Sequence, residues 1–251
     1  MSTATASTGT IEGQSAEIEL RNSLLNALTI SSGAVDSISF LALGKVFTAF
    51  MTGNVAFLGI GIAGGPGPRI VWVLASMLGF AVGIYVATKI TSSGDQKTGS
   101  IWSPRTTIAL AVSLLPHLAF VTIWFKNSGR PGASYVPILL AVWALAMGLQ
   151  SAAVRKLDVA GIFTTAATAT FLFLFSDLAN WRLSVDERRR MWGILISLII
   201  GATAGVYLLF HAPIYAPVLP LVITAGVVGT AAKVRWQSLA DSSVAARSHL
   251  G

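Results

Sequence analysis

The residue most able to do chemistry in this sequence is Asp36, an acid in the middle of an apolar run. Its neighbours Ser32, Ser37 and Ser39 make the surrounding segment polar on more than one face. A charge at the centre of a bilayer costs about 2.5–3.5 kcal/mol on insertion scales, so such a residue normally faces a partner or a wet cavity. We therefore predict that Asp36 points into a helix bundle and binds solute or carries a proton. The alternative is a neutral aspartic acid that only hydrogen-bonds neighbouring helices.

A second polar stretch follows within a few residues. Thr48 and Thr52 are four apart and would share one face of a helix, and Gly53 and Asn54 continue the polar run. Such a surface could coordinate a solute or ion through hydroxyl, amide and carbonyl oxygens. Threonines also bond back to their own helix, which is the structural alternative.

The second half of the chain offers polar counterparts. We expect Gln150 and Thr164 to complete a site on the axis between the two halves. His117 follows Pro116 within an apolar run, where an imidazole beside a proline-freed carbonyl could join a proton path. A lone histidine is more often a structural hydrogen-bonding residue.

Composition indicates which elements must position these side chains. The 251-residue chain is 54% apolar and only 11% charged, with a mean hydropathy of +0.73, far from the roughly 25% charge of soluble domains. Several runs reach the length of about 20 residues that a spanning helix needs, and the alternation of a membrane β-barrel is absent. The sequence predicts an all-α polytopic transmembrane helix bundle embedded in lipid.

Eight apolar runs could span the membrane. The breaks at Gly44-Lys45, at 155–161 and at 211–213 are weak, so the number falls to six or seven if tight turns there are wrong. The eight runs are Asn22–Leu43, Val46–Ala63, Ile70–Ile90, Thr106–Phe125, Tyr135–Val154, Ile162–Ala179, Met191–Phe210 and Ile214–Ala232.

The order of matching residues predicts a duplication. Gly33 matches Gly148, Val46-Phe47-Thr48 matches Ile162-Phe163-Thr164, and the Gly-x-x-x-Gly pair Gly79/Gly83 matches Gly201/Gly205, at offsets of 115, 116 and 122 residues. We expect a disordered tail (1–21), two four-helix membrane repeats (22–125 and 135–232) and a C-terminal tail (233–251). Four spans per repeat would give parallel repeats, whereas a re-entrant helix in each would give inverted ones. The paired glycines predict close helix packing, at the repeat interface or across a homodimer.

Charge distribution predicts the orientation. With eight spans, 11 of the 17 lysines and arginines lie on the side of the N-terminus. Positive charge marks the cytoplasmic side, so both termini should be cytoplasmic, in a bacterial inner membrane. The net charge of +7 then reflects membrane topology, and no motif indicates nucleic-acid binding.

Several kinds of chemistry lack their usual residues. The chain has no cysteine, which excludes disulfides and thiolate metal sites. His-Glu-x-x-His, Gly-x-Ser-x-Gly and P-loop motifs are absent, as is any acid and histidine cluster fit for a metal. We therefore expect neither an enzyme nor a bound cofactor.

Three motifs carry a resemblance to a known family. They are Gly33-x-x-Asp36 followed by Leu41 to Asn54, Gly148-Leu149-Gln150-Ser151 with Arg155-Lys156-Leu157, and Asp177-Leu178-Ala179. With them the chain resembles the YoaK-like family of bacterial membrane proteins, also called DUF1275 or UPF0700, over the whole membrane region. The function of that family is not established, so the resemblance implies membrane location and fold without a chemistry.

Two functions agree with these features. The first is a small-solute transporter or permease, with a mid-membrane polar site between the repeats and proton coupling through Asp36. The solute itself is not identified by any residue pattern. The second is a non-transporting membrane scaffold, or a protein that senses lipid or a partner, in which the same polar residues only hold helices together.

Overall fold

The computed structural model describes residues 3–92, 102–157, 167–180 and 182–248. Every regular element in these ranges is helical, which confirms the all-α prediction. The elements are α1 (Thr3–Ala42), α2 (Met51–Ile62), α3 (Ile70–Ser92), α4 (Pro104–Lys126), α5 (Val136–Arg155), α6 (Ala167–Asn180), α7 (Val185–His211), the short 3-10 helix η1 (Pro213–Tyr215) and α8 (Val218–Ser248).

Six of the helices are long and apolar enough to cross a membrane in the described part of the chain: α1, α3, α4, α5, α7 and α8. Helices α2 and α6 have only 12 and 14 residues. At 1.5 Å per residue they reach about 20 Å, short of the roughly 30 Å hydrocarbon core. The expected span Val46–Ala63 therefore contains only the half-length α2, and the described residues hold six candidate spans. The expected span Ile162–Ala179 begins outside the described residues, which contain its part from Ala167 as α6.

The N-terminal segment also differs from its prediction. Residues 1–21 were expected to be a disordered tail, but α1 is helical from Thr3 and its apolar span begins at Ser15. The segment contains no proline, so nothing stops the spanning helix from continuing toward the terminus.

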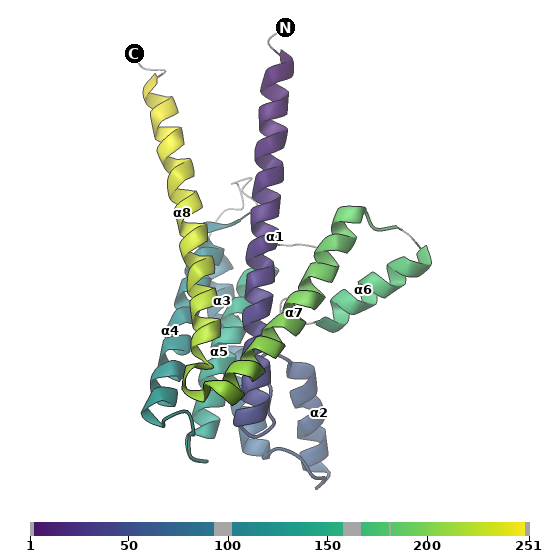
Figure 1. The fold of residues 1–251 in the computed structure, drawn as a ribbon, viewed down its shortest axis with the longest axis vertical. Coiled ribbons are helices and arrows are strands. Elements are labelled where there is room, and N and C mark those ends of the chain that lie inside the picture. Colours follow the sequence, from purple (N-terminus) through teal and green to yellow (C-terminus); the bar gives the residue numbers. More distant parts are fainter. Residues whose placement is uncertain (1–2, 93–101, 158–166, 181, 249–251) are drawn as a thin grey trace.

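Spans that follow one another in the sequence run in opposite directions along the long axis of the bundle (Figure 1). Helices α1, α4 and α7 run away from the end that carries both termini, and α3, α5 and α8 run toward it. Close contacts agree: Gly79 of α3 lies against Ala141 of α5, and Gly83 lies against Leu145, so these two helices are parallel.

These directions decide how the two halves are related. Each half contains three spans and one half-length helix, so α5 enters the membrane opposite to α1. The halves are therefore inverted, and the parallel arrangement that follows from four spans per half is wrong. In the first half the cause is the short α2, because α3 begins at the same end of the bundle at which α1 finishes.

The halves pack through equivalent contacts. In each, a glycine of the first helix lies directly against the backbone of the third helix of the other half, with no room for a Cβ. Gly33 meets Leu198 and Ala202 of α7, and Gly148 meets Phe80 and Ile84 of α3. Gly148 stands 115 residues after Gly33. Leu198 stands 118 residues after Phe80, and Ala202 stands 118 residues after Ile84. The pair α1/α7 thus repeats the pair α5/α3.

This register corrects the predicted glycine alignment. Gly83 lies against Leu145, and Gly201 lies against Ile30, the residue 115 before Leu145. Gly201 is therefore the counterpart of Gly83, one helical turn from the predicted partner Gly79. All four glycines of the two Gly-x-x-x-Gly motifs, including Gly205 against α1, are used at the interface between the halves within one chain.

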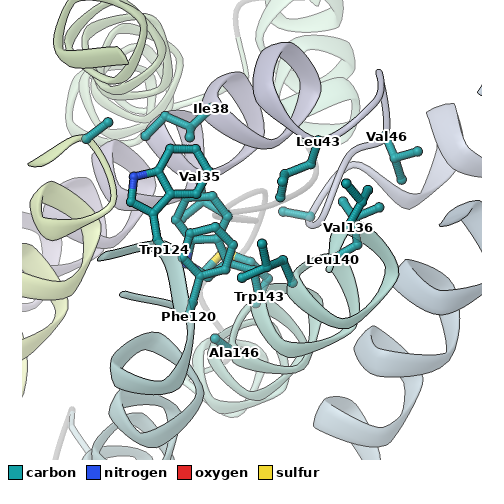
Figure 2. Packing of buried hydrophobic residues seen from close by; sticks show 14 of the residues in the cluster. Val35, Ile38, Leu43, Val46, Phe120, Trp124, Val136, Leu140, Trp143 and Ala146 are labelled. Atoms are coloured by element: carbon teal, nitrogen blue, oxygen red, sulfur yellow. The ribbon is translucent and has the colours of Figure 1, made fainter. Parts of the chain in front are cut away.

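Two apolar clusters fill the bundle. One lies toward the end opposite the termini, where Phe120 and Trp124 of α4 stack in a row with Trp143 of α5 (Figure 2). The other includes Leu25 and Leu28 of α1 and lies toward the termini. Buried polar residues occur between these clusters, namely Ser31, Ser32, Ser113, His117, Gln150 and Thr224.

The equivalent glycines give a stability prediction. Gly33→Ala and Gly148→Ala should each destabilise the protein by about 1–3 kcal/mol, because the added methyl group overlaps a backbone carbonyl. Gly229→Ala in α8 is the matched control, since a Cβ there meets nothing within 4 Å. Melting of the detergent-purified variants measures the effect, and equal melting temperatures for all three would contradict the packing described.

The six-span topology gives a second prediction in this cysteine-free chain. Single cysteines at Gly67 and Gly132 should be labelled by an impermeant thiol reagent from one side of the membrane, and one at Ser184 from the other. An eight-span chain would instead place all three on one side. Labelling in intact cells and in inverted vesicles distinguishes the two topologies.

Candidate functional site

Asp36 lies on the inner face of α1 and is 2% exposed. Its carboxylate accepts backbone hydrogen bonds from Thr48 and Ala49 at 2.7 Å and from Phe50 at 3.0 Å. The hydroxyl of Thr48 donates a further bond at 3.3 Å. The side chain thus points into the bundle and is occupied by the segment that leads into α2.

The three N–H groups bound by Asp36 have a common origin. They precede Met51, the first residue of α2, where the chain is not helical, and Phe50 at the N-cap provides no side-chain cap. Unpaired N–H groups inside a bilayer cost several kcal/mol each. Asp36 satisfies the N–H groups of the three residues that lead into α2, and its negative charge lies near the positive end of the α2 dipole.

Asn54 fixes the other side of the same segment. Its amide donates to the carbonyl of Phe47 at 2.7 Å and accepts from the N–H of Phe47 at 3.1 Å. Ser76 of α3 donates to the same carbonyl at 2.6 Å. Residues 46–50 are therefore held by α1, α2 and α3 together, which is how irregular backbone is accommodated at membrane depth.

The predicted threonine face does not form. Because α2 begins at Met51, Thr48 lies outside the helix, and the four-residue spacing does not align it with Thr52. Thr48 is fully buried against Asp36, whereas Thr52 is exposed. Of the first-half site residues, Asp36, Thr48 and Asn54 are brought together and Thr52 is not.

The second-half candidates lie elsewhere. Gln150 is fully buried and donates from Nε2 to the carbonyl of Leu28, two turns from Asp36 along α1, while its Oε1 has no partner among the described residues. Thr164 lies outside the described residues. His117 accepts from Trp143 Nε1 at 3.1 Å, and its Nε2 is buried without a partner there.

A cavity of about 940 Å³ lies between the terminal ends of α1 and α7. Leu25, Asn26 and Ile194 line it where the two helices approach, and Asn22 lines its α1 wall. Figure 1 shows this part of α7 leaning away from α1. Asp36 is not among the lining residues.

The sister pair of helices is closed at the equivalent place. There Gly79 of α3 touches the backbone of Ala141 of α5. Gly79 corresponds to Ser197 of α7, 118 residues later, and Ala141 corresponds to Asn26 of α1, 115 residues earlier. Asn26 lines the cavity. The two halves are thus alike where Gly33 and Gly148 pack and differ two turns beyond. There α1 and α7 meet through the side chain of Asn26 against Gly193, and not backbone against backbone as at Gly79 and Ala141.

Asp177 at the end of α6 has a structural role outside the six spans. It accepts from the N–H of Leu183 at 2.6 Å and from the guanidinium of Arg188 at 2.8 Å. The bond from Leu183, followed by that from Arg188, holds the pKa of Asp177 below its usual range. A carboxyl group whose pKa is lower in the folded than in the unfolded protein stabilises the fold at a pH above its unfolded-state pKa. The stabilisation from Asp177 is therefore lost as the pH falls through its folded-state pKa.

Sequence reasoning missed two parts of this arrangement. Ser76 completes the support of Phe47, and a hydroxyl in the otherwise apolar run from Ile70 was its visible signal. The cavity between α1 and α7 depends on where two distant helices diverge, and no local pattern predicts that.

The geometry gives a stability prediction for Asp36→Asn. Asparagine keeps one acceptor oxygen, but its NH2 group must face an N–H donor, so we expect a loss of about 1–3 kcal/mol in stability. Ser37→Ala is the matched control, because the Ser37 hydroxyl only bonds back to Ala34 of its own helix. Melting in detergent tests this, and an unchanged Asp36→Asn protein would show that the carboxylate does not support α2.

Comparison with known proteins agrees with the membrane fold. Residues 24–230 match the family model described as "Protein of unknown function (DUF1275)". The UPF0700 transmembrane protein YoaK of Bacillus subtilis (strain 168) is 33% identical over 170 residues, which cover 68% of this chain and 72% of that protein. No solved structure matches the chain. The chain, a helical membrane protein with an inverted repeat, belongs to the DUF1275 family.

Proposed function

We propose that this protein is a transporter or permease for a small solute, and that its two inverted halves open alternately on the two sides of the membrane. The proposal includes no chemical change of the solute. Inverted repeats with half-length helices near the bilayer midplane are typical of secondary transporters.

One observation carries the proposal. The pairs α1/α7 and α5/α3 are equivalent in register and inverted in the membrane, but one diverges around a cavity and the other is closed at Gly79 and Ala141. If the two pairs exchange conformations, the cavity closes on the side of the termini and an equivalent one opens on the other side. Alternating access requires two such states.

The buried polar residues supply a path between the two openings. Leu25 and Asn26 line the inner part of the cavity, and Leu28, less than one turn further along α1, accepts the hydrogen bond from Gln150. The unpartnered Oε1 of Gln150 and hydroxyl of Ser32 are free to bind a passing solute among the described residues. In this proposal Asp36 positions α2 and does not meet the solute.

A second candidate is a non-transporting scaffold or sensor of lipid or partner. The specific observation in its favour is that the polar groups of Asp36, Thr48 and Asn54 are bonded to the protein backbone. Their chemistry is fully accounted for by structure, and they do not themselves require a solute.

The orientation is part of the proposal. Of the 17 lysines and arginines, Lys45, Arg69, Lys126 and Arg130 belong to the connections opposite the termini. The remaining basic residues of the described part lie toward the termini. The excess of basic residues on the side of the termini is therefore larger than in an eight-span topology, where 11 of the 17 lie on that side. This excess supports cytoplasmic termini in a bacterial inner membrane.

Cysteine accessibility tests the exchange of states. Asn26→Cys should react with an impermeant reagent from the side of the termini, and Ala141→Cys from the opposite side. A bulky adduct on Asn26→Cys, made in the protein that also carries Ala141→Cys, should reduce the reaction rate at Ala141, because the cavity can no longer close. Gly132→Cys, in an open turn, is the control and should react at an unchanged rate.

The two candidate functions predict different outcomes. Ala141→Cys that never reacts from the opposite side, or reacts at the same rate with Asn26→Cys modified, would reject alternating access and leave the scaffold.

A further inference from the structure

We propose that the cavity between α1 and α7 binds a molecule that carries an anionic group and a protonated amine joined by a short link, as in an amino acid or a phosphoethanolamine headgroup. This inference rests on the proposed function only where the ligand is the transported solute. Binding itself can be tested without transport.

The cavity is lined by charges of both signs. Arg189 and Arg190 of α7 contribute positive charge, and Glu19 of α1 and Asp186 of α7 contribute negative charge. Within the described part of the chain, none of these four has an oppositely charged partner within 4.0 Å. A ligand with a single charge would meet repulsion from one set, whereas a zwitterion finds a partner in both.

The basic side of the cavity attracts an anion, beside Glu187 as the acidic group already near Arg190. Arg190 is the charged neighbour of Arg21, so two guanidinium groups lie near each other. Nε of Arg21 is buried and has no hydrogen-bond acceptor in the described part of the chain. A carboxylate or phosphate would offset the repulsion and accept from guanidinium donors in their preferred geometry.

The same end of the cavity requires a donor. Oδ1 of Asn22, which lines the cavity beside Arg21 in sequence, is buried and has no donor among the described residues. A protonated amine donates to such an oxygen and is attracted by Glu19 and Asp186. Asn22 lines the cavity and offers the unpartnered acceptor, whereas Arg21 is not a lining residue. The anionic end of the ligand would therefore meet the lining residues Arg189 and Arg190.

The rest of the lining limits the ligand's shape. Leu25 and Ile194 are buried apolar residues in the lining, and the exposed Trp192 lies at the level of the basic residues. A volume of about 940 Å³ lies in the range of small-ligand sites. The site accepts a small apolar substituent beside the charged groups, with some water.

Melting of the full-length protein in detergent measures binding. L-Alanine should raise the melting temperature saturably, while propionate and ethylamine at equal concentration should not, because each lacks one of the two charges. Nanodiscs of phosphatidylethanolamine against phosphatidylcholine test the headgroup source, with stabilisation expected only by the lipid that has a primary amine. Stabilisation by either source supports the inference and identifies the source, and stabilisation by neither overturns it.

Variants locate the site. Arg190→Gln and Asn22→Leu should each raise the half-saturating concentration by about tenfold or more, since one charged or buried hydrogen bond is lost. Arg182→Gln, exposed and not lining the cavity, removes the same charge and should bind normally. Melting without ligand verifies that each variant folds, and equal affinity in all three would overturn the assignment.

The two proposals fail in different ways. Zwitterion binding without alternating cysteine accessibility would retain this inference and reject transport. Alternating accessibility without zwitterion binding would do the reverse.

Discussion

The need to satisfy backbone N–H groups inside the membrane governs this structure. Between α1 and α2 the chain leaves helical geometry at residues 43–50, and the part from Val46 to Phe50 is largely buried in the bundle. Asp36 accepts three of the N–H groups, and Asn54 and Ser76 hold the peptide groups of Phe47. This support allows α2 to begin partway through the membrane. A half-length α2 in turn makes the number of crossings in the first half odd, which inverts the second half.

A single acid therefore has consequences far beyond its own hydrogen bonds. Its burial costs desolvation, which the converging N–H donors and the α2 dipole offset. An acid buried in a transmembrane helix is often interpreted as a substrate or proton site. Here the acid holds the backbone that leads into α2, and among the described residues Gln150, Ser32 and Asn22 have unfilled hydrogen-bonding capacity elsewhere.

The features that the sequence predicted well were those with a strong local signal. Apolar run length located all six spans, and the Gly-x-x-x-Gly spacing identified helices that approach closely. The number of crossings failed because apolarity alone does not distinguish a 12-residue helix preceded by irregular backbone from a full span, as at Val46–Ala63. The inward orientation of Asp36 was predicted, but its bonds to backbone N–H groups were not, since they depend on where α2 begins. The glycine alignment slipped by one turn because the shared Gly-x-x-x-Gly-x-Tyr pattern favours Gly79 as the match for Gly201, whereas the helix contacts pair Gly201 with Gly83.

The inverted relation of the halves also has a consequence for the evolutionary origin of the repeat. A tandem duplication of a three-crossing unit yields two copies of opposite sidedness only if the ancestral unit could insert in either direction. Such a unit must have carried little difference in basic residues between its two ends, because a strong bias would have fixed its insertion. In the present chain four basic residues remain in the connections opposite the termini. The distribution of basic residues in the present chain, with few opposite the termini, is thus unlike the one that such a unit would need.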